Sequence, residues 1–221
     1  MIDCFNIRTC HLFPSNVLAS QFRLRYRSNI ERQSWDVPYW EELEYDTYDN
    51  PATTYFTWRD EQDVVRGCAR LYPTDRPYML LEAFSDLVTQ WTLPTSDPTV
   101  WEGSRLCVDK TLPPETRKRI IHELALGYLE FAIKRNITRI IGVMLPAYWR
   151  GVYVNSGWDP EWYGDVTKLP NGDRVRAGGL PVSQAVLDNV RRTTGIYEDV
   201  LYFGHNDFGK EKGKTQTHEA A

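Results

Sequence analysis

The chain has 221 residues, of which 42% are hydrophobic and 25% are charged, a balance typical of a globular protein rather than a disordered or fibrous one. Its 26 basic and 30 acidic residues give a net charge of -4, which argues against a protein whose whole surface attracts nucleic acid or anionic membrane. The longest apolar run, residues 140–145, is far shorter than the ~20 residues of a transmembrane helix.

The sequence pattern gives no targeting or metal-binding signal. The N-terminus has no basic segment followed by a long apolar core, so we expect a cytoplasmic protein. The four cysteines have no CxxC spacing and the four histidines are scattered. We therefore predict small buried thiols, no metal site and no metal cofactor.

In the first half of the chain, the apolar pattern predicts a strand over residues 1–7 and a helix that begins near Ser15 and ends before Pro38. An acidic, aromatic loop follows at 35–51. The β-rich runs TTYFTW and VVRGCARLYP, joined by a polar turn, are typical of a hairpin. A short helix near 80–87 and a strand at 100–109 complete this half.

In the second half, a pair of prolines precedes the clearest predicted helix, 115–135, whose apolar stripe is wide enough to pack on a sheet. The elements expected after it are a strand at 137–145, a short helix at 146–157, a turn at 170–173, a helix at 184–195 capped by Ser183, and a strand at 199–203. This alternation predicts an α/β fold, a single-domain three-layer α-β-α sandwich with a mixed sheet. We expect the domain to span 1–207, with halves of about 1–110 and 111–207, and a disordered polar tail at 208–221.

Four carboxylates crowd into eight residues of the first half, Glu42, Glu44, Asp46 and Asp49. Carboxylates this close repel one another and need cations, for which Arg25, Arg70 and Arg105 are candidates because a guanidinium can bridge carboxylates. Neighbouring aromatic residues would complete a receptor for an organic cation. A solvated acidic loop is the alternative.

Motifs in this half resemble the LuxI-type acyl-homoserine lactone synthases, the autoinducer synthases of bacterial quorum sensing. Arg25 and Trp35 precede the pattern E-x-D-x-Y-D, which begins at Glu44. Arg70 lies in RLYPT, and Phe84 occupies the position of a family phenylalanine. The string WEGSRLCVD then supplies Glu102, Ser104 and Arg105. Together these matches cover residues 25–109.

The resemblance implies a fold similar to the GNAT acyltransferases and a bacterial enzyme that joins S-adenosylmethionine (SAM) to an acyl thioester and releases methylthioadenosine. SAM is then a substrate, and no enzyme nucleophile is required. SAM carries a sulfonium, an ammonium and a carboxylate, which a pocket of carboxylates, rings and arginines complements.

The resemblance also implies roles for individual residues. Asp46 and Asp49 would orient the SAM amine, and Glu102 would take its proton, directly or through water, with Asp46 as the alternative base. Arg70 and Arg105 would anchor the carboxylates, including that of SAM. The remaining residues of the predicted SAM site are Arg25, Trp35, Phe84 and Ser104. For each arginine, a purely structural salt bridge is the alternative.

Two departures from the family pattern concern pocket shape. Asn29 stands where the family usually has phenylalanine, four residues after Arg25. Val143 stands where synthases that prefer 3-oxo chains often have threonine, and its side chain cannot donate a hydrogen bond, so we expect an unsubstituted acyl chain. The predicted acyl-binding set is Val143, Leu145, Trp149, Tyr153 and Trp158. Its bulk favours a short, branched or aryl group, and a plain aromatic core is the alternative reading.

The acyl donor is expected to be acyl-carrier protein or acyl-CoA. An acidic carrier protein could dock on a basic patch formed by Arg117, Lys118, Arg119 and Arg150. We expect no nucleic-acid or membrane partner. The competing functions are a GNAT-type N-acyltransferase acting on another amine, although its pyrophosphate-loop motif is missing, and a non-catalytic module that binds SAM or an acyl group.

Overall fold

The computed structural model describes residues 1–204. The predicted tail at 208–221, and the last residues of the predicted domain, lie outside the described residues. Within residues 1–204, no helix combines the length and the apolar character needed to cross a membrane.

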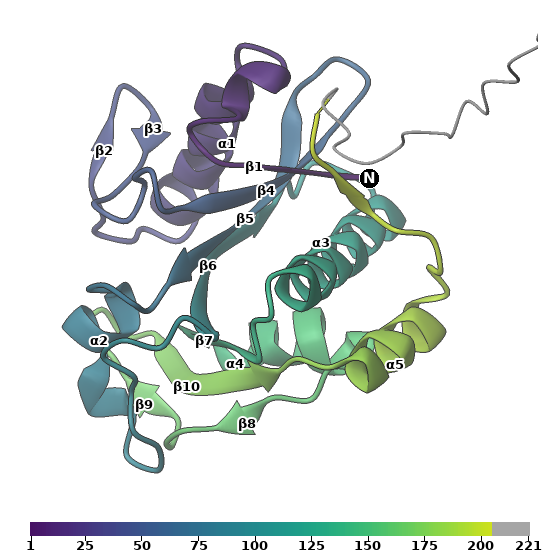
Figure 1. The fold of residues 1–221 in the computed structure, drawn as a ribbon. Helices are drawn as coiled ribbons and strands as arrows, with labels where there is room; N and C mark the ends of the chain where they lie inside the picture. The colour runs from purple at the N-terminus through teal and green to yellow at the C-terminus, as the bar shows by residue number, and fades with distance from the viewer. Residues whose placement is uncertain (205–221) are drawn as a thin grey trace, which may run out of the picture.

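A mixed sheet of nine strands forms the centre of the fold (Figure 1). Its order is β11 (Leu201–Tyr202), β1 (Ile2–Phe5), β4 (Thr54–Arg59), β5 (Val65–Pro73), β6 (Val100–Val108), β7 (Arg139–Met144), β10 (Arg174–Pro181) and β8 (Glu161–Trp162), and β9 (Thr167–Lys168) also pairs with β10. The β1–β11 and β6–β7 pairs are parallel, and the other pairs are antiparallel.

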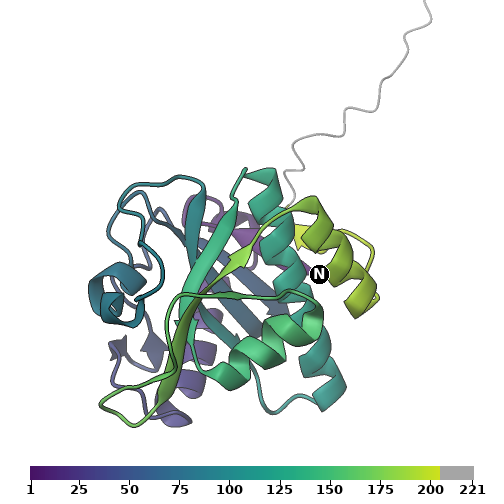
Figure 2. The ribbon, with the colours of Figure 1, turned by 90° about the horizontal axis from the view of Figure 1, so that it is seen from below.

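Helices cover both faces of this sheet, as Figures 1 and 2 show. The helices α3 (Pro114–Lys134) and α5 (Gln184–Thr194) pack together on one face, with α4 (Pro146–Tyr148) beside them. On the other face, α1 (Val17–Arg25) lies against β5 and β6, and α2 (Met79–Ala83) lies near the start of β6. This arrangement confirms the predicted three-layer α-β-α architecture.

The sheet divides between β6 and β7. These two strands pair at only three positions, from Val100 opposite Arg139 to Glu102 opposite Ile141. Beyond them, β6 continues beside β5 and β7 continues beside β10. The two halves of the sheet are therefore joined by a short parallel ladder, and chemical groups near Glu102 lie where the halves separate.

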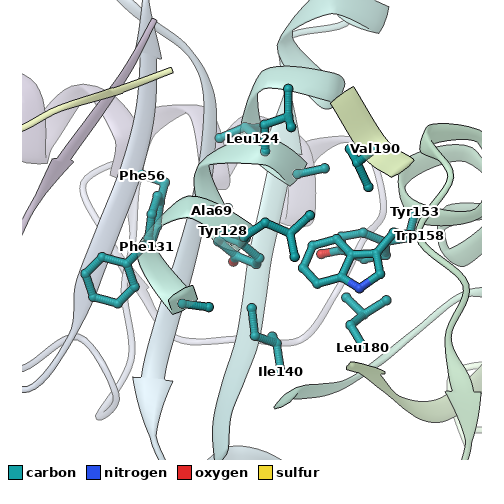
Figure 3. Close-up of a cluster of buried hydrophobic side chains, with 14 of the residues drawn as sticks. Phe56, Ala69, Leu124, Tyr128, Phe131, Ile140, Tyr153, Trp158, Leu180 and Val190 are labelled. Carbon is teal, nitrogen blue, oxygen red and sulfur yellow. The ribbon is translucent and has the colours of Figure 1, made fainter. Parts of the chain in front are cut away.

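The main hydrophobic core lies between α3 and the sheet (Figure 3). The Phe56 ring packs edge-on against Tyr128 and Phe131, two members of the predicted stripe on α3. The helix approaches β5 closely because Gly67 has no side chain: a Cβ atom there would lie 2.3 Å from Ile120 Cγ2. Two smaller clusters lie on the other face, one beneath α1 and one beside α2.

Several sequence predictions need adjustment at their boundaries. The first helix is regular only to Arg25 and continues as a π-helical turn, Tyr26–Glu31. The predicted helix at 146–157 is a succession of short turns: α4, a π-helical turn Trp149–Tyr153 and a 3-10 turn Val154–Ser156. The long strand β10 and the short strands β2 (Tyr39–Trp40), β3 (Leu43–Glu44), β8 and β9 were not predicted.

Candidate active site

Six charged side chains form a closed ring on the α1 side of the sheet. Guanidinium and carboxylate groups alternate in the order Arg25, Glu44, Arg105, Asp46, Arg70 and Asp49, and the last contacts the first. Each adjacent pair is joined by an N–O contact of 2.6 to 3.0 Å. Three positive and three negative charges cancel, so the ring satisfies its own charges in a buried position.

Local structure explains how the three carboxylates reach one place. Glu44 ends β3, and the chain then turns so that the backbone N–H of Asp46 donates to the Asp49 carboxylate at 2.9 Å. The backbone N–H of Asp49 donates to the Asp46 carbonyl at 3.0 Å. The E-x-D-x-x-D spacing therefore encodes a tight turn with its acidic groups on one side.

The arginines come from three different elements. Arg25 is the last residue of α1, Arg70 lies on β5, and Arg105 lies on β6. The β5–β6 register shifts beside Arg105, whose backbone has φ of 56°, a left-handed conformation that is rare outside glycine. Such a bulge re-aims a side chain, and here it points Arg105 at Glu44 and Asp46.

Two members of the ring, Asp49 and Arg70, are held in their charged forms by their neighbours. Burial alone would raise the pKa of Asp49, but the hydrogen bonds and charge of Arg25, with the charge of Arg70, lower that pKa well below its ordinary value. Burial also opposes the charge of Arg70, but Asp49 and Asp46 raise its pKa. Asp49 and Arg70 therefore remain ionised near neutral pH.

Glu102 lies close to the ring and is fully buried. Its carboxylate accepts hydrogen bonds from the backbone N–H groups of Met79 at 3.0 Å and Leu80 at 2.6 Å. Burial raises the pKa of Glu102 to about 7, although these hydrogen bonds and the charge of Arg70 lower it in part. The Met79 sulfur also lies 3.7 Å from Arg105 Nη1. A carboxyl group that titrates near neutrality beside a charged ring has the properties of a general acid or base.

The other residues of the predicted SAM site lie around this centre. Ser104 Oγ accepts a hydrogen bond from Arg70 Nε at 3.0 Å. Phe84 packs against the apolar cluster beside α2. The indole N–H of Trp35 donates to the Asp173 carboxylate at 3.1 Å rather than to a member of the ring.

Two further residues contact the ring and were not predicted to do so. Tyr55 donates its hydroxyl hydrogen bond to Asp49 at 3.1 Å. Asn29 Nδ2 donates to Glu44 at 3.3 Å, so Asn29 is a neighbour of the ring. Asn29 is neither charged nor aromatic, so little in the sequence indicated a place beside the charge ring. The only signal was that asparagine is unexpected at this position of the motif.

The predicted acyl-binding residues lie on opposite faces of the sheet. Val143 packs against the apolar cluster on the Glu102 face. Trp149, Tyr153 and Trp158 belong to the main core on the α3 face, where Figure 3 labels the last two. The Trp149 and Trp158 indoles donate to the carbonyls of residues 176 and 181 on β10, at 2.9 and 2.8 Å. Leu145, partly buried, precedes α4. This packing favours a structural role for the three aromatic residues.

The predicted carrier-docking residues lie at two sites on the surface. Lys118 and Arg119 are exposed near the start of α3, and Arg119 forms an ion pair with Glu123 at 2.7 Å. Arg117 is half-buried on the same helix, and Arg150 is exposed after α4. Across the part of the chain that the structure describes, no group of three or more His, Cys, Asp or Glu side chains is arranged to hold a metal ion.

This chain is similar in sequence to a family of known proteins. The family model "Autoinducer synthase" matches residues 10–190. An acyl-homoserine-lactone synthase of Ralstonia solanacearum is 32% identical over 133 residues, which span 58% of this chain and 65% of that protein. One from Agrobacterium fabrum is 30% identical over 177 residues, covering 78% of this chain and 82% of the relative.

Solved structures extend the similarity to the fold. A CoA-dependent acyl-homoserine lactone synthase, BjaI, in complex with MTA, has a TM-score of 0.79 and 26% identity, with 92% of both chains covered. A putative N-acetyltransferase from Lactobacillus plantarum has a TM-score of 0.52 and 16% identity, which confirms the GNAT-like fold. The chain therefore belongs to the autoinducer synthase family, the family of the acyl-homoserine-lactone synthases.

Proposed function

We propose that this protein transfers an acyl group from a thioester to SAM and closes the product to an N-acyl-L-homoserine lactone, a quorum-sensing signal. The observation that carries the proposal is the neutral six-membered charge ring beside Glu102, whose pKa is raised to about 7. SAM carries charges of both signs, which paired charges in the protein complement. Its ammonium must lose a proton to a base that is ionised near pH 7 before the amine can act as a nucleophile.

The most accessible edge of the ring is the natural place for the amino-acid part of SAM. The Asp46 and Arg105 side chains are 9% and 8% exposed, whereas the other four members are at most 2% exposed. A SAM ammonium beside Asp46 and a SAM carboxylate beside Arg105 would replace one ion pair with two. Asp49, Arg25, Arg70 and Glu44 would then hold this edge in position.

The reaction balances without an enzyme nucleophile. Glu102, directly or through a water, takes a proton from the SAM ammonium, and the amine attacks the thioester carbonyl. A C–N bond forms, the thioester C–S bond breaks, and the thiol leaves with a proton. The SAM carboxylate then attacks the carbon next to the sulfonium, so that a C–O bond forms, a C–S bond breaks and methylthioadenosine leaves. Asp46 is the alternative base.

The acyl donor is an acyl thioester for which two carriers compete. BjaI has also been solved with SAM and isopentyl-CoA, at 25% identity to this chain, which supports a short or branched acyl-CoA. The basic residues at the start of α3 support an acidic acyl-carrier protein instead. Val143 supports an unsubstituted chain because it offers no hydrogen bond to a 3-oxo group.

The test is product formation from SAM and a panel of acyl-CoA and acyl-carrier thioesters, followed by mass spectrometry. The proposal expects methylthioadenosine in equal amount to one acyl-homoserine lactone. Salt then separates the carriers: docking predicts that the carrier-protein rate falls steeply with ionic strength, and that the Arg117→Glu and Arg119→Glu variants lose this dependence. An acylated product from another amine would point to a general N-acyltransferase, and SAM binding without product would point to a binding module.

A further inference from the structure

A chain of hydrogen bonds leaves the charge ring and ends on the other half of the sheet. Asn29, only 2% exposed, donates from Nδ2 to the Glu44 carboxylate at 3.3 Å. Its Oδ1 accepts a hydrogen bond from Gln33 Nε2 at 3.4 Å. The Oε1 of Gln33 accepts one from the Tyr148 hydroxyl at 3.2 Å. Tyr148 is the last residue of α4, which follows β7. These hydrogen bonds therefore connect the charge ring to the second half of the sheet.

The segment that carries Gln33 and Trp35 depends on such contacts. Residues 32–38 contain no helix or strand. Gln33 and Trp35 contact Tyr148 and Asp173, which are 115 and 138 residues away in the sequence. Next to Asn29, the Trp35 N–H donates to the Asn29 backbone carbonyl at 2.9 Å. The position of this segment is therefore fixed from the ring on one side and from the second half of the sheet on the other.

The side-chain type at position 29 is what permits this connection. An amide offers both donors and an acceptor, so Asn29 can donate to Glu44 and accept from Gln33 at once, which an apolar side chain cannot do. A buried amide costs free energy unless it is hydrogen-bonded, and here both ends have partners. The connection between Glu44 and Gln33 therefore depends on the amide of Asn29.

We propose that Asn29, Gln33 and Tyr148 are positioning residues that couple the SAM site to the acyl half of the enzyme. The inference rests on the proposed function, since it assumes that SAM binds at the ring. A shift of Tyr148 or Gln33 would displace Asn29, which donates to Glu44, and would also displace the segment that carries Trp35. SAM affinity therefore depends on a tyrosine hydroxyl of the other half, and the coupling is reciprocal for a ligand that contacts α4.

The test measures SAM binding by calorimetry for the full chain and three variants, Tyr148→Phe, Gln33→Leu and the double variant. Loss of one hydrogen bond in the chain should raise the SAM Kd about fivefold. The double variant should bind SAM no more weakly than Gln33→Leu, because Gln33→Leu already removes the bond to Tyr148 together with those to Asn29 and the Ser28 carbonyl. Tyr197→Phe, at a residue 64% exposed, is the matched control and should leave the Kd unchanged. An unchanged Kd in Tyr148→Phe, or additive losses in the double variant, would overturn the proposal.

Turnover separates this inference from the proposed function. In Tyr148→Phe we expect the KM for SAM to rise about fivefold while kcat changes less than about twofold, because the bond positions the site and does not take part in chemistry. If the wild-type protein makes the lactone but Tyr148→Phe leaves the SAM Kd unchanged, only the coupling is refuted. If Tyr148→Phe weakens SAM binding but the wild-type protein releases no methylthioadenosine, only the proposed function is refuted. Asn29→Phe offers a further variant, and Tyr148→Phe, which changes a residue that is 37% exposed, keeps the test valid if Asn29→Phe does not fold.

Discussion

Replacing Glu102 with glutamine should change the pH dependence of both stability and turnover. Glu102 is fully buried, and burial raises its pKa to about 7 from an ordinary value of 4.5. Glutamine has nearly the same shape but does not titrate. Its amide oxygen can accept from one of the Met79 and Leu80 N–H groups, while its NH2 group faces the other, so the variant loses one backbone hydrogen bond at every pH.

The sign of the stability effect follows from the raised pKa. The folded state holds the Glu102 proton more tightly than the unfolded state does, so this group's contribution to stability is fully present below pH 4.5 and is lost as the pH rises through about 7. The pKa difference corresponds to about 3 kcal/mol. Glu102→Gln lacks this loss, so its free energy of unfolding should rise relative to wild type by about 3 kcal/mol between pH 4.5 and pH 8.

Turnover should follow the opposite trend, since only the ionised carboxyl can act as a base. The rate of methylthioadenosine release should fall about 10²- to 10⁴-fold in Glu102→Gln. The ratio of wild-type to variant rates cancels the titration of the SAM amine itself. If the group titrates near pH 7, this ratio should rise about tenfold between pH 6 and pH 8.

Urea unfolding and initial-rate measurements on both proteins at pH 5, 6, 7 and 8 test these expectations together. The refuting results are specific. A constant difference in unfolding free energy across this range would mean that the Glu102 pKa is not raised. A Glu102→Gln variant that keeps the wild-type rate would remove Glu102 as the base and leave Asp46 in that role.

Three other predictions concern the ring and the acyl pocket. Arg25→Met should lower the free energy of unfolding by about 3–5 kcal/mol because it leaves buried carboxylates underpaired, whereas Arg76→Met, in an exposed ion pair, should cost less than ~1 kcal/mol; equal losses in urea unfolding would contradict the buried ring. Because Arg25 keeps the pKa of Asp49 well below its ordinary value, the stability that Asp49 contributes is present above about pH 4 and lost on acidification, and Asp49→Asn should lack this loss in acid-unfolding curves. Val143→Thr should raise kcat/KM for 3-oxo donors relative to unsubstituted donors by about tenfold, and an unchanged ratio would exclude contact between this residue and the third carbon of the chain.

Local patterns were enough to predict most of the main elements and the members of the ring, but not the strand β10. The helix expected at 115–135 is α3, Pro114–Lys134, because its apolar stripe matches the helical repeat and a proline fixes its start. The acidic turn was informative since three carboxylates in six residues need nearby cations. Arg25, Arg70 and Arg105 are those cations.

Other features depend on contacts between distant segments, and the sequence did not predict them. The closure of the ring depends on a bulge at Arg105 that shifts one register between β5 and β6. Aromatic composition alone did not show that Trp149 and Trp158 lie on the α3 face, opposite Glu102. The two-residue strands β2 and β3 are too short to leave a periodic signal.

The most direct test of the account is one measurement: the products formed from SAM and an acyl thioester by wild-type protein, analysed by mass spectrometry beside Glu102→Gln. We expect one methylthioadenosine for each N-acyl-L-homoserine lactone in the wild type, and a loss of both products in the variant. Methylthioadenosine without lactone, or lactone formed equally well by Glu102→Gln, would contradict it.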